Sequence, residues 1–103
     1  MTRAVFSRRG ERWRVEMDGH ADYDPGHDVV CAGCSAIVYA LANYLRGVGA
    51  ERLEERLEPG EVRLEAEGGG AVAAAFQMAA VGLEEIARQY PEHVQVKKSE
   101  NFF

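Results

Sequence analysis

The residues best able to do chemistry gather between positions 18 and 35 of this 103-residue chain. The stretch contains two histidines and both cysteines of the protein: His20, His27, Cys31 and Cys34. It also contains four aspartates, Asp18, Asp22, Asp24 and Asp28, so its surroundings should be electronegative. Imidazoles and thiols ligate metals, form redox pairs, or combine as nucleophile and base in acyl transfer. The spacing of these residues has to distinguish among the three.

The spacing is poor for a metal site. A structural zinc site usually presents a second pair of ligands well downstream, and no second Cys or His pair follows Cys34. Three aspartates imitate the start of a calcium loop, but its sixth position is His27 where glycine is needed. Its twelfth position is Gly33 where a bidentate glutamate is needed. We expect a solvated acidic loop with no metal and no other cofactor.

A helix over residues 28–48 separates the two cysteines. Asp28 is a good N-cap whose side chain can accept bonds from amides up to Cys31. The predicted buried stripe of this helix is Val30, Cys34, Ile37, Leu41, Leu45 and Val48. Cys34 on that stripe should be packing, whereas Cys31 lies in the first turn. A redox or metal-binding role for the Cys31/Cys34 pair stays an alternative, although thioredoxin-like motifs belong to folds with a different element order.

Cys31 also has the features of a nucleophile. Amides and the dipole at a helix start favour a thiolate, and those amides, including that of Cys31, can donate to an oxyanion. His20 lies eleven residues upstream, across a loop with Pro25 and Gly26 that is long enough to return the imidazole to the thiol. This loop should be mobile, since little in it can be buried. Spacing alone does not decide whether Cys31 and His20 act together or have no common role.

The run Gly19-His20-Ala21, followed by Gly26-x-Asp28-Val29-Val30-Cys31-Ala32-Gly33-x-Ser35, resembles the signature of the ribosomal-processing cysteine proteases. Length and element order resemble that family over most of the chain. The resemblance implies a homodimeric cytoplasmic endopeptidase that removes the N-terminal extension of a large-subunit ribosomal protein. Cys34 departs from the signature, because an aliphatic residue is expected there.

The resemblance also implies roles for residues of this chain. Cys31 would be the nucleophile and His20 its acid/base, with Asp28 and Ser35 in support. Substrate contacts would come from Gly19, Ala21, Asp22, Asp24 and Gly26. A non-catalytic, ribosome-associated binding module is a further alternative, against which an intact Cys31 and His20 argue.

The remaining chain predicts a single α+β domain over residues 1–103, with a mostly antiparallel sheet of four to five strands. Alternating apolar residues indicate strands near 4–6, 13–17, 61–67 and 94–96. Residues 51–58 suit either a short helix or one strand of a charged hairpin. We favour the hairpin. A second helix over 71–90 has two apolar faces. One of them is a candidate subunit contact.

The net charge and the two ends of the chain limit which partners and which cellular location are expected. A formal net charge of -5 argues against direct nucleic-acid binding and is compatible with a basic peptide. The basic start is followed by no uninterrupted apolar stretch, and the sequence predicts no apolar run long enough to cross a membrane, so we expect a cytoplasmic chain. The last residues, including Phe102 and Phe103, should be a frayed end, or an aromatic pair that occupies a neighbouring groove.

Overall fold

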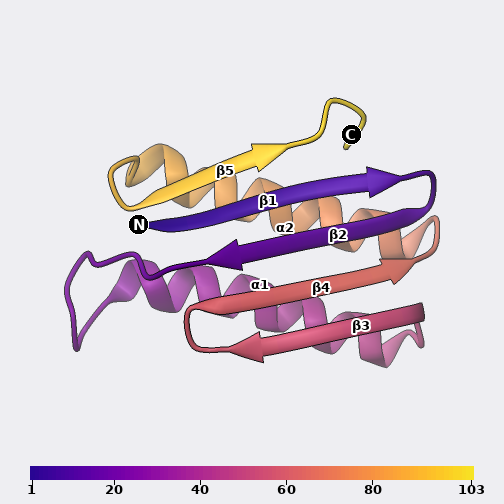
Figure 1. The fold of residues 1–103 in the computed structure, drawn as a ribbon, viewed down its shortest axis with the longest axis horizontal. Helices are drawn as coiled ribbons and strands as arrows, with labels where there is room; N and C mark the ends of the chain where they lie inside the picture. Colours follow the sequence, from indigo (N-terminus) through magenta and orange to yellow (C-terminus); the bar gives the residue numbers. More distant parts are fainter.

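The sheet forms from five segments in which apolar and polar residues alternate. The computed structural model describes residues 1–103, and its strands are β1 (Thr2–Arg9), β2 (Arg12–Asp18), β3 (Glu51–Glu58), β4 (Glu61–Glu67) and β5 (Val94–Lys98). They lie in the order β3-β4-β2-β1-β5 (Figure 1). All neighbouring pairs are antiparallel except β1 and β5, which are parallel. The predicted α+β fold with a mostly antiparallel sheet is confirmed.

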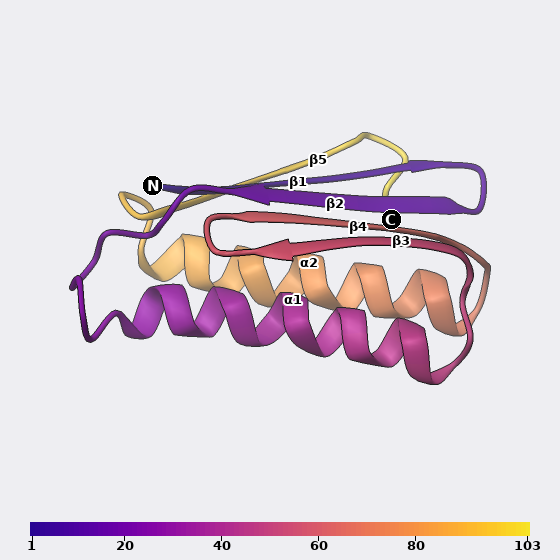
Figure 2. The same cartoon turned by 60° about the horizontal axis from the view of Figure 1, so that its bottom comes forward.

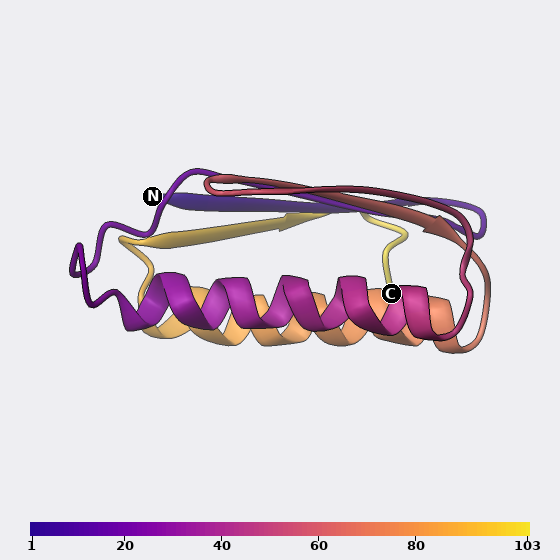
Figure 3. The ribbon, with the colours of Figure 1, turned by 90° about the horizontal axis from the view of Figure 1, so that it is seen from below.

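Two helices cover one face of this sheet and leave the other face open. They are α1 (Val29–Gly47) and α2 (Ala71–Gln89), which run side by side beneath the strands (Figures 2 and 3). The apolar face of each element meets the others between the two layers, where Phe6, Trp13 and Phe76 are at most 1% exposed. Burial of these aromatic side chains is a main source of stability for a chain of this size.

Residues 51–58 form a strand, which agrees with the charged hairpin favoured from the sequence. Leu53 and Leu57 are four residues apart, and both are partly buried against the core. A separation of four places two residues on one face of a helix, but because four is even it also places them on one face of a strand. The pairing of β3 with β4 decides between these two readings.

The buried stripe of α1 differs from the predicted one. Val38 and Ala42 are fully buried, whereas Ile37 is only partly buried and Val48 is 45% exposed. The reason is that α1 ends at Gly47 and packs against α2 as well as the sheet. Ile37 faces α2 along the open groove between the helices, so the fully buried surface lies beside it, at Val38 and Ala42, and stops before Val48.

By length and composition, α1 could cross a membrane, contrary to the sequence prediction. It has 19 residues and a mean hydropathy of 1.4 over its most apolar window. Core helices of globular proteins meet the same criteria. In this structure α1 packs on α2 and contributes six buried residues to the core.

The C-terminal tail is not frayed. Phe102 is fully buried, with its ring centroid 5.4 Å from that of Phe6 and 5.3 Å from that of Trp13. The side chain of Gln77 donates a 3.0 Å hydrogen bond to the Phe102 carbonyl. The prediction that both aromatic residues lie free for another groove is therefore wrong for Phe102. Phe103 remains 60% exposed.

Candidate active site

Asp28 joins the loop after β2 to the start of α1. Its Oδ1 accepts the amide of Cys31 at 2.8 Å, as predicted for an N-cap, and its Oδ2 accepts the amide of Tyr23 at 2.9 Å. The Cys31 amide bond is the largest cause of a lowered pKa of Asp28. The carboxylate thus fixes both the helix start that carries Cys31 and the loop that follows His20.

His20 lies directly after β2 and rests on the turn between β3 and β4. The amide of Gly19 donates to the carbonyl of Gly60 at 2.9 Å, which extends the pairing of β2 with β4. A Cβ atom on Gly60 would lie 2.8 Å from Nε2 of His20. The imidazole therefore covers the one residue of this turn that has no side chain, and only glycine leaves it room.

The loop and α1 bring the imidazole and the thiol to one small pocket. His20, Cys31 and Ser35 line it together, in a volume of about 50 Å³. Its other walls come from the start of β1, the end of β2, α1, and the β3–β4 turn with the residues that flank it: Thr2, Met17, Gly19, Cys34, Tyr39, Glu58, Pro59, Gly60, Glu61 and Val62. No hydrogen bond joins His20 to Cys31 in this structure. A substrate carbonyl placed over Cys31 would be next to the imidazole.

The two cysteines differ in exposure although they are one helical turn apart. Cys31 is partly exposed, whereas Cys34 is 1% exposed within the core. Burial raises the pKa of the Cys34 thiol to about 11, and the nearby Cys31 adds to this effect. Since the thiolate is the reactive form, Cys34 is a poor redox or metal partner at neutral pH. No group of three or more His, Cys, Asp or Glu side chains is placed to hold a metal ion.

The predicted oxyanion donor needs a correction. We expected the amide of Cys31 to be among the helix-start donors, but it is already bound to the Asp28 carboxylate. An amide donates one hydrogen, so in this structure it is not free for an oxyanion. The cap that orients Cys31 thereby occupies the donor nearest to it.

The residues expected to contact substrate fall into two groups. Gly19 lines the pocket, and Asp22, Asp24 and Gly26 are exposed in the loop that leads to α1, where Asp22 lies 3.5 Å from the N-terminal ammonium. Ala21 is fully buried, so its side chain is not available to a substrate. The expectation that little of this loop is buried is wrong at that position, because Ala21 packs into the core cluster.

Gly60 was missed from the sequence as a site residue. Pro59-Gly60 was visible as a turn signal, but nothing local connects that turn to His20, which lies 40 positions earlier. The connection arises from the register of β2 on β4, which pairs Asp18 with Glu61. Tyr39 and Glu58 reach the pocket in the same way, through tertiary packing rather than through any motif.

A thiol at a capped helix start beside an imidazole is the arrangement that cysteine peptidases use for acyl transfer. The family model described as "Cysteine protease Prp" matches residues 1–95, so the chain belongs to this cysteine protease family. The resemblance identified in the sequence is thereby confirmed.

Named relatives agree with this assignment. A curated relative from Staphylococcus aureus, "Ribosomal processing cysteine protease Prp", is 51% identical over 39 residues. That match spans 37% of each chain. Two crystal structures of the S. aureus ribosomal processing protease are similar over 96% of this chain and 100% of theirs. One, with a covalently linked product peptide, has a TM-score of 0.85 at 27% identity. The other, with a substrate peptide, has a TM-score of 0.80 at 26% identity.

Proposed function

We propose that this chain is a cysteine endopeptidase that removes the N-terminal extension of a large-subunit ribosomal protein. The observation that carries the proposal is the shared pocket of Cys31 and His20, which lie eleven residues apart in the chain. Family membership supports the reaction type. The name and the bound peptides of the S. aureus relatives support the substrate class.

The reaction proceeds in two halves. The Cys31 thiolate attacks the scissile carbonyl, and the C–N bond breaks as His20 gives its proton to the leaving amine. The product is a thioester on Cys31. His20 then takes a proton from water, whose oxygen attacks the thioester; the C–S bond breaks, the acid product is released, and the Cys31 thiolate and protonated His20 are restored. Ser35, one helical turn from Cys31, supports the site from the pocket wall.

His20 reaches Cys31 mainly by rotation of its side chain. Gly19 is bonded to Gly60 and the side chain of Ala21 is buried, so the backbone on both sides of His20 is held. The oxyanion is stabilised either by release of the Cys31 amide from Asp28 or by a donor that arrives with the peptide. Exchange of the Cys31 amide with deuterium, with and without peptide, separates these two routes.

The surroundings of the pocket suit a basic peptide. Glu58 and Glu61 line the pocket, and Asp22 and Asp24 are exposed in the loop that follows His20; of these four carboxylates only Asp24 has no ion pair. Such a field raises the local concentration of cationic substrate and weakens as salt is added. The expected partner is therefore the basic N-terminal segment of a ribosomal protein, in the cytoplasm, without direct contact to nucleic acid or membrane.

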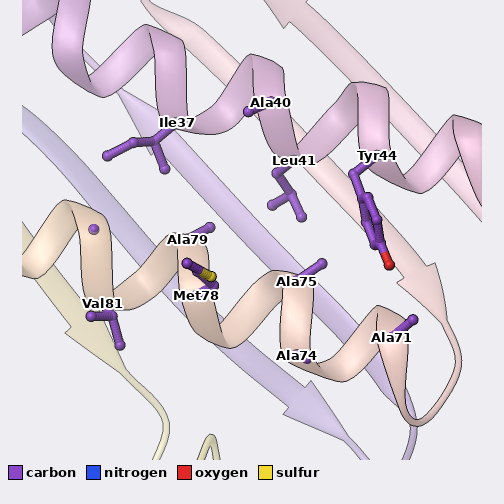
Figure 4. Close-up of a pocket in the computed structure, with 11 residues that line it drawn as sticks. Ile37, Ala40, Leu41, Tyr44, Ala71, Ala74, Ala75, Met78, Ala79 and Val81 are labelled. Atoms are coloured by element: carbon purple, nitrogen blue, oxygen red, sulfur yellow. The ribbon is translucent and has the colours of Figure 1, made fainter.

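We also propose a homodimer, formed through a groove between α1 and α2. The groove measures about 630 Å³, and ten of its eleven lining residues are hydrophobic (Figure 4). Met78 is 78% exposed and Val81 is 56% exposed at its rim. Water contact of such side chains is unfavourable, and a second copy that presents the same groove would cover them.

Proteolysis of a synthetic peptide tests the proposal. The peptide should span the extension and the first residues of the mature ribosomal protein. We expect a single cut, which Cys31→Ala and His20→Ala abolish and Cys34→Ala preserves. If Cys34→Ala were as inactive as Cys31→Ala, a function of the cysteine pair would replace the protease reading.

A further inference from the structure

His93 reaches the loop of the candidate site from the far end of the chain. It lies in the turn between α2 and β5, and its Nδ1 is 2.8 Å from the carbonyl oxygen of Ala21. A carbonyl oxygen only accepts, so Nδ1 carries the proton and His93 is the donor. The bond joins positions 72 residues apart, and its acceptor belongs to the residue directly after His20.

The His93 ring is itself held on several sides. Tyr23 packs edge-on against it, with ring centroids 5.3 Å apart, and packs likewise against Tyr90 at 5.2 Å. The backbone amide of His93 donates to the Tyr90 carbonyl at 2.9 Å, and its carbonyl accepts the Thr2 amide at 2.9 Å. His93 is therefore a fixed support that joins the loop to the sheet.

We propose that His93 is a positioning residue that holds His20 for its reaction with Cys31. The proposal rests on the proposed function. Gly19 is bonded to Gly60 on one side of His20, and Ala21 is bonded to His93 on the other. Because both neighbours are held, the backbone of His20 is fixed near Gly60. Only the side-chain torsions of His20 then have to be ordered for the reaction. His93 lines no part of the pocket and acts only through the Ala21 carbonyl.

The effect of this support should be on rate rather than on substrate binding. A general base must come within hydrogen-bond reach of its proton, and a displacement of about 1 Å costs about 100-fold in rate. Without the His93 bond, His20 samples more orientations, and the entropy cost of ordering it in the transition state is larger. We therefore expect kcat for peptide cleavage to fall while KM changes little.

Two substitutions separate the hydrogen bond from the packing. His93→Phe keeps a ring against Tyr23 but has no donor, whereas His93→Asn keeps a donor near the position of Nδ1 and loses the ring. If the bond positions His20, His93→Phe should lower kcat by at least about 10-fold and His93→Asn should stay within about 3-fold of wild type. Thermal unfolding of each variant measures how much the stability of the fold changes together with kcat.

A second readout needs no peptide. The rate of Cys31 alkylation by iodoacetamide, followed across pH by mass spectrometry of the Cys31 peptide, reports how far His20 assists formation of the thiolate. We expect a His20-dependent component in wild type that is absent from His20→Ala, is lost in His93→Phe and is kept in His93→Asn.

Three results would overturn the inference, and they are distinguishable. If wild type and His20→Ala are alkylated alike, the Cys31–His20 pairing fails and the proposed function with it. If these two differ but His93→Phe matches wild type in alkylation and in kcat, only the positioning role fails. If His93→Asn loses as much as His93→Phe, a donor at this position does not restore His20, and the hydrogen bond to Ala21 is not what positions it.

Discussion

The pocket at the start of α1 and the groove between α1 and α2 contrast in size and chemistry. The pocket holds about 50 Å³, and its polar lining consists of two thiols, an imidazole, three hydroxyls and two carboxylates. The groove holds about 630 Å³ and is lined almost entirely by apolar side chains (Figure 4). The two share no lining residue.

The difference separates two tasks that one helix performs. The first turns of α1 present Cys31 beside a cap, where backbone amides and a carboxylate fix its place. The later turns present Ile37, Ala40 and Tyr44, which carry no reactive group suited to acyl transfer. A large apolar groove is suited to contact with another protein surface, whereas a small polar pocket is suited to a chemical reaction. Volume alone would point to the groove, which contains neither a thiol nor an imidazole.

The largest expected effect is on the pocket, through Gly60→Ala. The new Cβ would lie 2.8 Å from His20 Nε2, so the imidazole must leave the resting position from which it turns toward Cys31, and we expect cleavage to slow by about 100-fold. Gly10→Ala is a matched control, because Gly10 also has a positive φ (+57° against +75°) but nothing within 4 Å of its Cβ position. Both should lose about 1 kcal/mol of stability from left-handed strain. Equal cleavage rates in the two variants would contradict the placement of His20.

The next effect is on the groove, through Met78→Asp. A carboxylate at the centre of an apolar contact should weaken self-association by about 100-fold or more, measured by sedimentation equilibrium. Val5→Asp is the control, since Val5 is also exposed (44%) but lies on a strand, β1, outside the groove. Peptide cleavage should persist in Met78→Asp, because pocket and groove share no residue. If cleavage disappears with the dimer, the two regions act together and the contrast drawn here fails.

A smaller effect should appear in alkaline solution and depend on Cys34. Its folded pKa of about 11 exceeds the reference value of 9.0, so the folded state holds the proton more tightly than the unfolded state. Stability is therefore complete below pH 9 and falls as pH rises from 9 toward 11, by at most about 2–3 kcal/mol. Cys34→Ala should lack this component of the slope in urea unfolding at a series of pH values. Identical slopes in both proteins would show that Cys34 is not buried as described.

The smallest effect concerns Asp28 in acid. The Cys31 amide holds the pKa of this carboxyl below its reference value of 3.8. Its contribution to stability is therefore present above pH 3.8 and is lost as pH falls through the lower folded value. The melting temperature of Asp28→Ala should be lower than that of wild type near neutral pH, and the two should converge in acid. Parallel curves would mean that the carboxylate charge contributes nothing to the cap.

Several features were predictable because they depend on residues close in the chain. Asp28 and Cys31 are three positions apart, so the cap follows from helix geometry alone. The same geometry places Cys34 on the buried side of α1, which removes the apparent Cys-x-x-Cys pair. The Gly-His-Ala and Asp-Val-Val-Cys runs are enough to indicate the family from the sequence alone.

Other features required the fold, since they depend on which distant segments meet. The stripe of α1 could not be placed without knowing that α2 lies beside it, and the buried position of Phe102 depends on Phe6 and Trp13. No local pattern reports such contacts, because a short apolar segment fits many partners equally well.

The sequence by itself determined the helix cap and the family, and it predicted Cys31 as the nucleophile. Only the tertiary structure decided what holds His20. Sheet register carries Gly60 beneath His20, and the turn before β5 carries His93 to the carbonyl of Ala21. Local hydrogen bonds and helix periodicity act over a few residues and can be read along the chain. Supports contributed from positions 40 and 72 residues away exist only once the sheet has closed around them.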